Sequence, residues 1–299
     1  MERFFRYVEI KTKITSLFAF LLAIAYLFYL EAPIRWDVTA IFFGGMFLFD
    51  LTTTAINNYI DTKTNHQTLP YQRGRAKAII FILLAISSAL GIWLVLLTDW
   101  VVFLTGGLCF LVGIFYTFGP IPISRQPWGE IFSGIFYGFF IPFLILYINL
   151  AKDTFLTLRV DWNHMDLIVQ WLPFIHLFLL SVAPVMTTAN IMLANNICDL
   201  EKDILVKRYT LPYYLEEKAL PLWAAMYYLT YGANVVMVLI GMLPWVTLVA
   251  LLTFIPVQKN IGLFFKEQKK ETTFMTSILN YILIMSGNVV ALLLAALLY

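Results

Sequence analysis

The sequence is poor in charged residues for its length, and this shortage argues against a water-soluble fold. Only 13% of its 299 residues are Asp, Glu, Lys or Arg, whereas 61% are hydrophobic. A soluble domain of ordinary composition carries roughly 25% charged residues. No stretch is both long enough and polar enough to form a separate soluble domain beside a single membrane anchor. The composition therefore predicts a protein whose surroundings are mostly the lipid bilayer, and we expect no nucleic-acid partner.

Cysteine is scarce as well. The chain has two cysteines, Cys109 and Cys198, and both fall in or at the ends of hydrophobic segments. They imply no disulfide framework, and their spacing does not suit a metal site. The first apolar run follows a basic and aromatic segment, residues 1–13, and no small-residue cleavage site comes after it. We therefore expect this run to be the first membrane span rather than a cleaved signal peptide.

Long hydrophobic runs, by contrast, recur along the whole chain. A membrane-spanning helix needs about 20 mainly apolar residues, and these runs are too long and continuous for the strands of a membrane barrel. We predict an all-α integral membrane fold with about nine transmembrane helices, forming a single domain over residues 1–299. The nine predicted spans are Ile14–Leu30, Val38–Ile60, Ala78–Leu97, Trp100–Phe118, Ile131–Leu150, Trp171–Ile197, Leu220–Ile240, Leu243–Val257 and Phe274–Leu298.

The basic residues predict how these spans are oriented. If the N-terminus lies inside the cell, every basic residue except Arg35, Lys152 and Arg159 falls in an inside segment. Cytoplasmic loops of membrane proteins carry such an excess of Lys and Arg. We therefore expect a multi-pass protein of the cell membrane, with its N-terminus in the cytoplasm and its C-terminus outside.

Two of the predicted cytoplasmic connections resemble each other. Residues 57–61 read Asn-Asn-Tyr-Ile-Asp and residues 195–199 read Asn-Asn-Ile-Cys-Asp. Each stretch is followed by Thr-Leu-Pro-Tyr, at 68–71 and at 210–213. The repetition indicates an internal duplication whose copies face one cavity, as in some transporters and membrane enzymes. The alternative is that both are ordinary amide-rich helix ends at the membrane surface.

Each copy places acidic and amide side chains together. Residues four apart share a face of a helix, so Asn57 should point with Asp61, while Asn195, Asp199 and Asp203 should form a second stripe. Carboxylate and amide oxygens suit Mg²⁺, which takes few protein ligands and completes its shell with substrate phosphates. Acidic residues at membrane depth are costly, and they indicate a functional site.

The loops that follow the two helix ends are basic. Lys63, Arg73 and Arg75 follow the first helix end, and Lys207 and Arg208 follow the second. Carboxylates that hold a metal ion, together with guanidinium and ammonium groups that bind phosphate oxygens, make up a diphosphate site. The sequence thus predicts magnesium-dependent diphosphate chemistry.

These motifs resemble those of the UbiA superfamily of membrane prenyltransferases. Asn-x-x-x-Asp at 57–61 and Asp-x-x-x-Asp at 199–203 look like its two signature motifs. Asn-Asn-Ile-Cys-Asp-Leu-Glu-Lys-Asp at 195–203, with Lys-Arg-Tyr-Thr-Leu at 207–211, is most similar to the 1,4-dihydroxy-2-naphthoate polyprenyltransferases of menaquinone synthesis. Phe-Tyr-Thr-Phe-Gly-Pro-Ile-Pro at 115–122, with Gly129-Glu130 after it, resembles a third loop of that branch. The resemblance covers essentially the whole chain and implies helices around a central cavity open to the cytoplasmic side.

The resemblance also implies an activity and a set of site residues. A UbiA-like enzyme ionises a polyprenyl diphosphate to an allylic carbocation and joins it to an aromatic acceptor, here a naphthoate-like one. The implied catalytic residues are Asn57, Asp61, Asn195, Asp199 and Asp203, of which Asn57, Asp61, Asp199 and Asp203 would hold Mg²⁺. The implied substrate-binding residues are Asn58, Lys63, Arg73, Arg75, Tyr116, Arg125, Tyr137, Asn196, Lys207 and Arg208.

Several of these roles have alternatives. Aromatic faces stabilise a carbocation, but aromatic side chains at helical spacing also simply pack or anchor a helix at the interface. The aromatic candidates are Tyr116, Phe132, Phe136, Tyr137 and Phe140. Arg125 is a candidate for positioning an anionic acceptor, or for snorkelling to lipid headgroups. His66 is a candidate base, or a solvated loop residue.

The first motif departs from the family pattern. Asn58 and Asn65 stand where the family usually has acidic residues, so two negative charges are missing. Either Mg²⁺ is held mainly by Asp61, Asp199 and Asp203, or the protein is an attenuated relative. Asp50, about three turns deeper in the same span, is a candidate source of the missing charge.

Other functions remain open at this stage. One is a relative that uses another acceptor, such as haem, homogentisate or 4-hydroxybenzoate. Another is a non-catalytic lipid-binding or scaffold protein. A third is a transporter, although acidic residues gathered on one side of the membrane suit a one-sided cavity better than alternating access.

Overall fold

A computed structural model of the chain describes residues 1–62, 68–119, 122–161 and 163–299. Lys63, Asn65 and His66, which the sequence singled out, lie outside the described residues. The chain forms two compact units. The first unit comprises Met1–Leu17 and Arg35–Arg125, and the second comprises Phe18–Ile34 and Gln126–Tyr299. Each unit is described by itself below.

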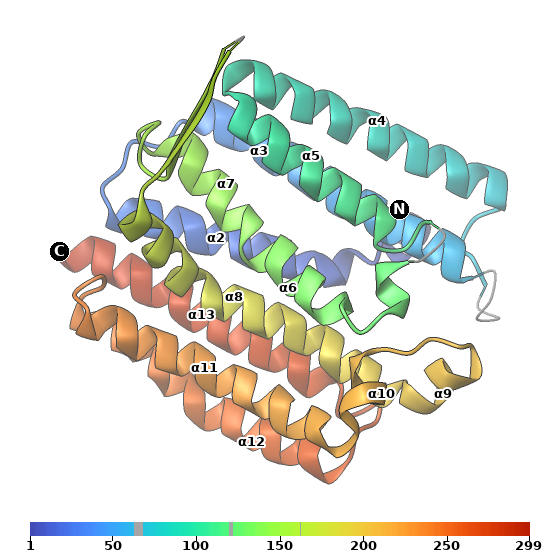
Figure 1. The fold of residues 1–299 in the computed structure, drawn as a ribbon. Coiled ribbons are helices and arrows are strands. Elements are labelled where there is room, and N and C mark those ends of the chain that lie inside the picture. The colour runs from blue at the N-terminus through green and yellow to red at the C-terminus, as the bar shows by residue number, and fades with distance from the viewer. Residues whose placement is uncertain (63–67, 120–121, 162) are drawn as a thin grey trace. The chain divides into compact units, whose positions relative to one another are not determined.

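The first unit is built on helices α3 (Trp36–Asp61), α4 (Arg73–Leu97) and α5 (Trp100–Phe115), which lie side by side (Figure 1). The short helices α1 (Glu2–Tyr7) and η1 (Ile10–Lys13) precede α2 (Ile14–Tyr29), which begins in this unit, and η2 (Ile123–Arg125) ends it. Asp99 caps α5: its Oδ1 accepts the backbone N–H groups of Val101 and Val102, at 2.9 and 3.4 Å. This cap explains why α5 begins at Trp100.

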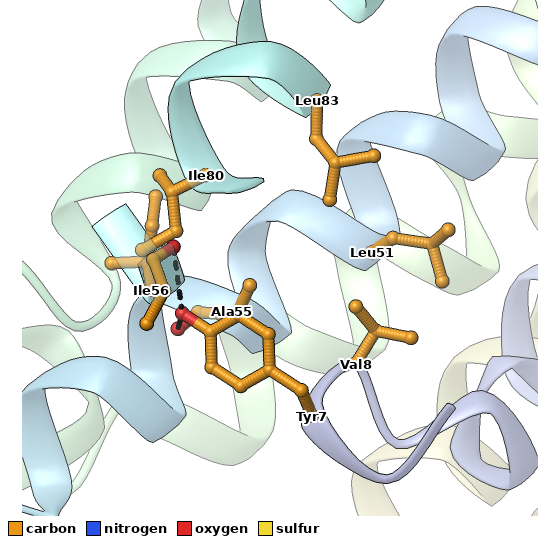
Figure 2. Packing of buried hydrophobic residues seen from close by; sticks show 8 residues of the cluster. Tyr7, Val8, Leu51, Ala55, Ile56, Ile80 and Leu83 are labelled. Carbon is orange, nitrogen blue, oxygen red and sulfur yellow. Dashed lines mark hydrogen bonds between the residues drawn. The ribbon is translucent and has the colours of Figure 1, made fainter. Parts of the chain in front are cut away.

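The buried core of the first unit fastens the N-terminal segment to α3 and α4. The cluster shown in Figure 2 takes side chains from the end of α1, from the second half of α3 and from the first half of α4. Its members are Tyr7, Val8, Leu51, Ala55, Ile56, Ala76, Ile80 and Leu83. Because α3 ends in the first sequence motif, this cluster sets the position of that motif within the unit.

The second unit contains the remaining helices. It has α6 (Gly129–Gly138), α7 (Phe140–Asn149), α8 (Trp171–Cys198), α9 (Leu200–Leu205), α10 (Leu211–Leu215), η3 (Glu216–Lys218), α11 (Ala219–Leu239), η4 (Trp245–Thr253), α12 (Phe254–Lys266) and α13 (Met275–Leu298). Strands β1 (Leu156–Val160) and β2 (Met165–Val169) form an antiparallel hairpin, in which Leu156 pairs with Val169. The all-α prediction missed this hairpin, which lies in the connection between α7 and α8.

Buried hydrogen bonds join the three central helices of the second unit, α8, α11 and α13. Asn190 on α8 donates from Nδ2 to the carbonyl of Trp223 on α11, at 2.9 Å. The backbone carbonyl of Asn190 accepts from Trp223 Nε1 at 3.2 Å and from Ser277 Oγ on α13 at 3.1 Å. Interhelical hydrogen bonds of this kind are one of the contributions that hold apolar helices together in a membrane.

Glycine brings α6 close to α8. A Cβ atom on Gly138 would lie 2.5 Å from the backbone carbonyl carbon of Pro184 and from Cα of Val185. A Cβ on Gly134 would lie 2.8 Å from the carbonyl oxygen of Val185. Such backbone contacts leave no room for a side chain, so α6 and α8 pack together only because both positions are glycine.

The prediction of about nine spanning helices is confirmed in outline. Each predicted run is helical, and eight helical segments among the described residues are long and apolar enough to cross a membrane. The fourth run is the exception, because α5 has only 16 residues. The fifth span is divided between α6 and α7 at Phe139, and the eighth begins with the 3-10 turns of η4 after Pro244. The helices expose many large apolar side chains, such as Ile92 and Leu96 on α4 and Phe178 on α8, as a surface in contact with lipid requires.

Candidate functional site

The second motif lies where α8 ends. Asn195 is in the last turn of α8, which ends at Cys198, and Asp199 follows as the C-cap. The carboxylate of Asp199 and the amide oxygen of Asn195 both contact the ammonium group of Lys270, which is 2.6 Å from Asp199 Oδ2. The side chains of Lys270 and Asp199 are 34% and 21% exposed, so this ion pair is accessible to solvent and solutes. Two oxygens of the motif therefore already converge on one cationic atom.

Lys270 is held by an ordered turn between α12 and α13. The backbone N–H groups of Thr272, Thr273 and Phe274 all donate to the carbonyl of Lys269, at 3.4, 3.0 and 3.0 Å. Thr273 Oγ1 accepts from the Lys269 N–H at 2.8 Å. The Lys270 ammonium also lies 5.0 Å from the centre of the Phe274 ring, within range of a cation–π contact.

A separate polar chain surrounds Asp203. Arg208 donates from Nη1 to Asp203 Oδ1 at 3.4 Å and from Nη2 to Asn196 Oδ1 at 3.3 Å. Asn196 in turn donates from Nδ2 to Oε1 of Glu130, the second residue of α6, at 2.8 Å. Glu130 and Asn196 are 2% and 1% exposed. The Glu130 Oε2 atom is buried and has no hydrogen-bond partner within the described ranges.

The structure therefore divides the predicted stripe of Asn195, Asp199 and Asp203. Since α8 ends at Cys198 and α9 begins at Leu200, these residues do not lie on one uninterrupted helix. Asp199 and Asp203 have different cationic partners. The two adjacent asparagines also have different partners: Asn195 contacts Lys270, whereas Asn196 is buried against Glu130.

The first motif lies at the end of α3. Asn57 Oδ1 accepts a hydrogen bond from Thr117 Oγ1 at 3.0 Å, and Asp61 is the last residue of the helix and half-buried. Asn58 donates from Nδ2 to the backbone carbonyl of Tyr7 at 2.9 Å. An ionised carboxylate at position 58 has no proton to donate to this carbonyl. The amide at position 58, where the motif resemblance predicts an acidic residue, thus makes a specific contact with the N-terminal segment.

The side chain of Tyr7 also binds the N-terminal segment to α3 and α4. Its hydroxyl donates to the carbonyls of Ala55 and Ala76, at 3.0 and 3.3 Å, and Figure 2 shows the ring lying within the buried cluster. Burial raises the pKa of the Tyr7 phenol well above its ordinary value, so the group stays protonated and able to donate. The N-terminal segment therefore supports the end of α3 that carries the first motif.

Asp50 has its own partners inside the first unit. Lys13 Nζ lies 2.7 Å from Asp50 Oδ1, and Ser16 Oγ donates to Oδ2 at 2.6 Å. The side chains of Lys13 and Asp50 are each only 5% exposed. Because an ammonium group already compensates this carboxylate, Asp50 does not supply a spare charge to the first motif.

The predicted basic residues have different environments. Arg73 donates to the carbonyls of Tyr59 and Thr62, at 3.1 and 3.3 Å, and so satisfies carbonyls at the end of α3. Arg75 and Lys207 are exposed, and Lys207 has a positive φ of 56°. Arg125, the last residue of η2, is half-buried.

The aromatic candidates are only partly gathered. Phe132 stacks on Phe136 with ring centres 5.9 Å apart, and Phe136 contacts Phe140 at 4.9 Å. These three rings form a row along α6 and the start of α7. Tyr137 on α6 and Tyr116, which follows α5, are each half-buried in their own units. Their roles toward a substrate stay predictions.

The donor set of the second motif fits a hard divalent cation. Among the described residues no group of three or more His, Cys, Asp or Glu side chains could hold a metal ion. Mg²⁺ needs only one or two carboxylates when substrate phosphates complete its shell. Asp199 supplies one carboxylate oxygen and Asn195 one amide oxygen, and the two lie close enough together to contact one ammonium group.

The sequence did not single out three residues that make these contacts. Lys270 was noted only as a basic residue on the predicted inside, and nothing in the sequence distinguishes it from the adjacent Lys269. Tyr7 was not singled out, because an aromatic residue near the start of a membrane protein is common. Glu130 was noted only as part of a resembling loop, next to Gly129.

Solved structures with the same fold define the class of this protein. A structure reported under the heading of digeranylgeranylglyceryl phosphate synthase has a TM-score of 0.66 at 16% identity and covers 99% of both chains. A UbiA homolog from Aeropyrum pernix K1 has a TM-score of 0.66 at 18% identity, covering 91% of this chain and 97% of its own. A UbiA homolog from Archaeoglobus fulgidus bound to DMAPP and Mg²⁺ has a TM-score of 0.62 at 12% identity, covering 97% and 99%. The protein thus has the fold of UbiA-type membrane proteins.

Sequence comparison assigns the family. The model of the UbiA prenyltransferase family matches residues 16–297, and the chain belongs to this family. It is also 28% identical over 226 residues to the 1,4-dihydroxy-2-naphthoate octaprenyltransferase of Bacillus subtilis (strain 168). That alignment spans 71% of this chain and 66% of the length of the relative. The predicted family resemblance is confirmed.

Proposed function

We propose that this protein transfers a polyprenyl group from a polyprenyl diphosphate to an aromatic acceptor, and that the acceptor is 1,4-dihydroxy-2-naphthoate or a close analogue. Residues 1–299 would act as one prenyltransferase domain in the cell membrane. The proposal rests on the family membership together with the paired oxygens of Asn195 and Asp199, which both contact the ammonium group of Lys270. The similarity to a naphthoate octaprenyltransferase supports the choice of acceptor.

The reaction breaks the bond between the allylic carbon and the diphosphate oxygen. The diphosphate leaves with the electron pair, and an electron-rich ring carbon then attacks the allylic carbocation. The ring regains aromaticity by losing a proton, or CO₂ from a carboxylated position. A bound Mg²⁺ would supply positive charge where the leaving diphosphate develops negative charge.

The chain's own residues have separate roles in this proposal. Asn57, Asp61, Asn195, Asp199 and Asp203 are the proposed catalytic residues, and the proposed Mg²⁺ ligands are Asn57, Asp61, Asp199 and Asp203. The proposed diphosphate-binding and acceptor-binding residues are Asn58, Lys63, Arg73, Arg75, Tyr116, Arg125, Tyr137, Asn196, Lys207 and Arg208. Of these, Asn58 binds the backbone carbonyl of Tyr7 and Arg73 binds that of Tyr59 near the end of α3, which favours a positioning role for both.

The test is prenyl transfer by the purified protein in nanodiscs. It receives Mg²⁺, a polyprenyl diphosphate and a panel of acceptors, including 1,4-dihydroxy-2-naphthoate, 4-hydroxybenzoate, homogentisate and haem. We expect a prenylated 1,4-naphthohydroquinone product and stoichiometric diphosphate release with the naphthoate acceptor. Asp199→Asn should abolish both, because it removes one of the two aspartate carboxylates of the second motif.

Asp153→Asn is the matched control. Asp153 is exposed in the connection between α7 and β1, far along the chain from the motif, and its variant should keep full activity. Transfer to another acceptor on the panel would correct the acceptor and keep the enzyme class. Background diphosphate release with every acceptor would overturn the proposal in favour of a binding or transport function.

A further inference from the structure

Lys270 contacts one of the proposed Mg²⁺ ligands, Asp199, together with the neighbouring amide oxygen of Asn195. Its ammonium contacts Asn195 Oδ1 and lies 2.6 Å from Asp199 Oδ2. An ammonium ion donates hydrogen bonds and accepts none, so each of these oxygens is used as an acceptor. A divalent cation coordinates oxygens in the same way, through their lone pairs. The ammonium and a metal ion therefore compete for the Asp199 carboxylate.

We propose that Lys270 is a further diphosphate-binding residue of this site, and that its ammonium compensates the Asp199 carboxylate and occupies the amide oxygen of Asn195 until a metal–diphosphate complex takes its place. On displacement its ammonium binds a non-bridging oxygen of the diphosphate. This inference deepens the proposed function and rests on it. It assigns a role to the connection between α12 and α13, which the sequence motifs do not include.

The exposure of the pair makes the exchange feasible. A fully buried ion pair resists separation, because each charge is then left without solvent. Lys270 and Asp199 are 34% and 21% exposed, and an ion pair that water reaches contributes little net stability. A doubly charged ion that also brings a bound diphosphate can displace such an ammonium.

The turn that carries Lys270 limits how far the ammonium moves. The carbonyl of Lys269 accepts three backbone N–H groups, and Thr273 Oγ1 accepts the Lys269 N–H, so the backbone is ordered. The displaced ammonium therefore stays within one side-chain length of the motif. The ring of Phe274, already 5.0 Å away, offers it a second contact during the exchange.

The adjacent Lys269 provides a matched comparison. Its ammonium pairs with Glu267 at 2.5 Å, its side chain is 62% exposed, and the Glu267 carboxylate raises the pKa of Lys269. Lys269 and Lys270 belong to the same turn and carry the same charge. Replacing either one by methionine changes the local charge equally, and only Lys270→Met removes the contact with the motif.

The first measurement is Mn²⁺ binding to the full-length protein in nanodiscs, without substrate, followed by the electron paramagnetic resonance signal of free Mn²⁺. Lys270→Met should bind Mn²⁺ roughly fivefold more tightly than the unmodified protein, because the competing ammonium is gone. Lys269→Met should show a much smaller change, and Asp199→Asn should weaken binding in either background. Equal affinities in Lys270→Met and Lys269→Met would overturn the proposal.

The second measurement is the affinity for inorganic diphosphate at saturating Mn²⁺, followed by calorimetry. Here the expected effect of the substitution is the opposite of its effect on Mn²⁺ binding. Lys270→Met should bind diphosphate several-fold more weakly, and Lys270→Arg should restore most of the affinity. Unchanged diphosphate affinity in Lys270→Met would also overturn the proposal. Lys270→Gln, which keeps a hydrogen-bond donor without the charge, replaces Lys270→Met if that variant does not fold.

Neither measurement depends on turnover. The proposed reaction and the proposed role of Lys270 can therefore be tested independently of each other. If the protein transfers no prenyl group yet Lys270→Met tightens Mn²⁺ binding and weakens diphosphate binding, the proposed reaction fails and the role of Lys270 stands. If transfer occurs and neither affinity responds to Lys270→Met, the role of Lys270 fails and the proposed reaction stands.

Discussion

The side-chain amide of Asn58, in the first motif, donates a hydrogen bond to the backbone carbonyl of Tyr7, with 2.9 Å between nitrogen and oxygen. The motif resemblance predicts an acidic residue at position 58, and this contact gives the asparagine found there a structural role. An amide here ties the N-terminal segment to α3, at the expense of one negative charge beside Asn57 and Asp61.

Asn58→Asp should therefore destabilise the protein rather than improve its metal site. The carboxylate cannot donate to the Tyr7 carbonyl, so two hydrogen-bond acceptors would face each other there. At this half-buried position, we expect the free energy of unfolding to fall by about 1–2 kcal/mol. Thermal unfolding in detergent and limited proteolysis of residues 1–13 measure the loosened segment. Asn57→Asp is the control, because Asn57 accepts from Thr117 and a carboxylate also accepts. Unchanged stability with tighter Mn²⁺ binding in Asn58→Asp would contradict this account.

Tyr7→Phe should lower the free energy of unfolding by about 1 kcal/mol near neutral pH, because it removes the donor to the Ala55 and Ala76 carbonyls and keeps the ring. The difference should depend on pH. Burial raises the pKa of the folded-state phenol, so its stabilisation is complete below the ordinary tyrosine pKa of about 10 and is lost as the pH rises above it. Unfolding of the wild-type protein and of Tyr7→Phe at pH 8 and pH 11 measures the difference in their free energies of unfolding. This difference should be smaller at pH 11. Tyr214→Phe, at an exposed position, should show no such difference.

Lys13 and Asp50 form a buried pair whose members cannot be removed singly. Lys13→Met leaves the Asp50 carboxylate buried without the ammonium group that compensates it. We expect the free energy of unfolding to fall by about 3–5 kcal/mol. Lys13→Met with Asp50→Asn should recover a large part of that loss, because no uncompensated charge remains. A double-mutant cycle on thermal stability measures the coupling. Additive effects of the two substitutions would show that the pair is not coupled.

Glu130 should act through the position of Asn196 and Arg208. Glu130→Gln keeps an oxygen that accepts from Asn196 Nδ2, so stability and Arg208 should be little affected. Glu130→Ala leaves the buried amide of Asn196 without its acceptor, which costs about 1–3 kcal/mol. We expect Glu130→Ala to raise the KM for polyprenyl diphosphate more than it lowers kcat, and Glu130→Gln to keep most of the wild-type KM.

Glu201→Ala is the control for this pair of variants. Glu201 is exposed on α9, close to Asp203 in sequence, and its removal changes the local charge without touching Asn196. Equal losses of function in Glu130→Gln and Glu130→Ala would contradict a positioning role and indicate that the carboxylate charge itself is needed.

The sequence by itself determined the class of this protein. Low charge and long apolar runs predicted the membrane fold, and the paired Asn-Asn-x-x-Asp motifs led to the UbiA family, which the comparisons confirmed. These properties can be read locally, because hydropathy and motif spacing belong to contiguous stretches of chain. The sequence also predicted that each motif stands at a helix end, as α3 and α8 show.

Only the tertiary structure decided which side chains meet. The sequence cannot tell Lys270, which contacts Asp199, from Lys269, which contacts Glu267 one residue away. Nor can it show that Asp50 is compensated by Lys13. Each of these partners depends on the path of a turn or on the packing of one segment against a helix. A side chain's charge is a property of its residue type, but the group that compensates this charge is set by backbone geometry over tens of residues, and so it emerges only on folding.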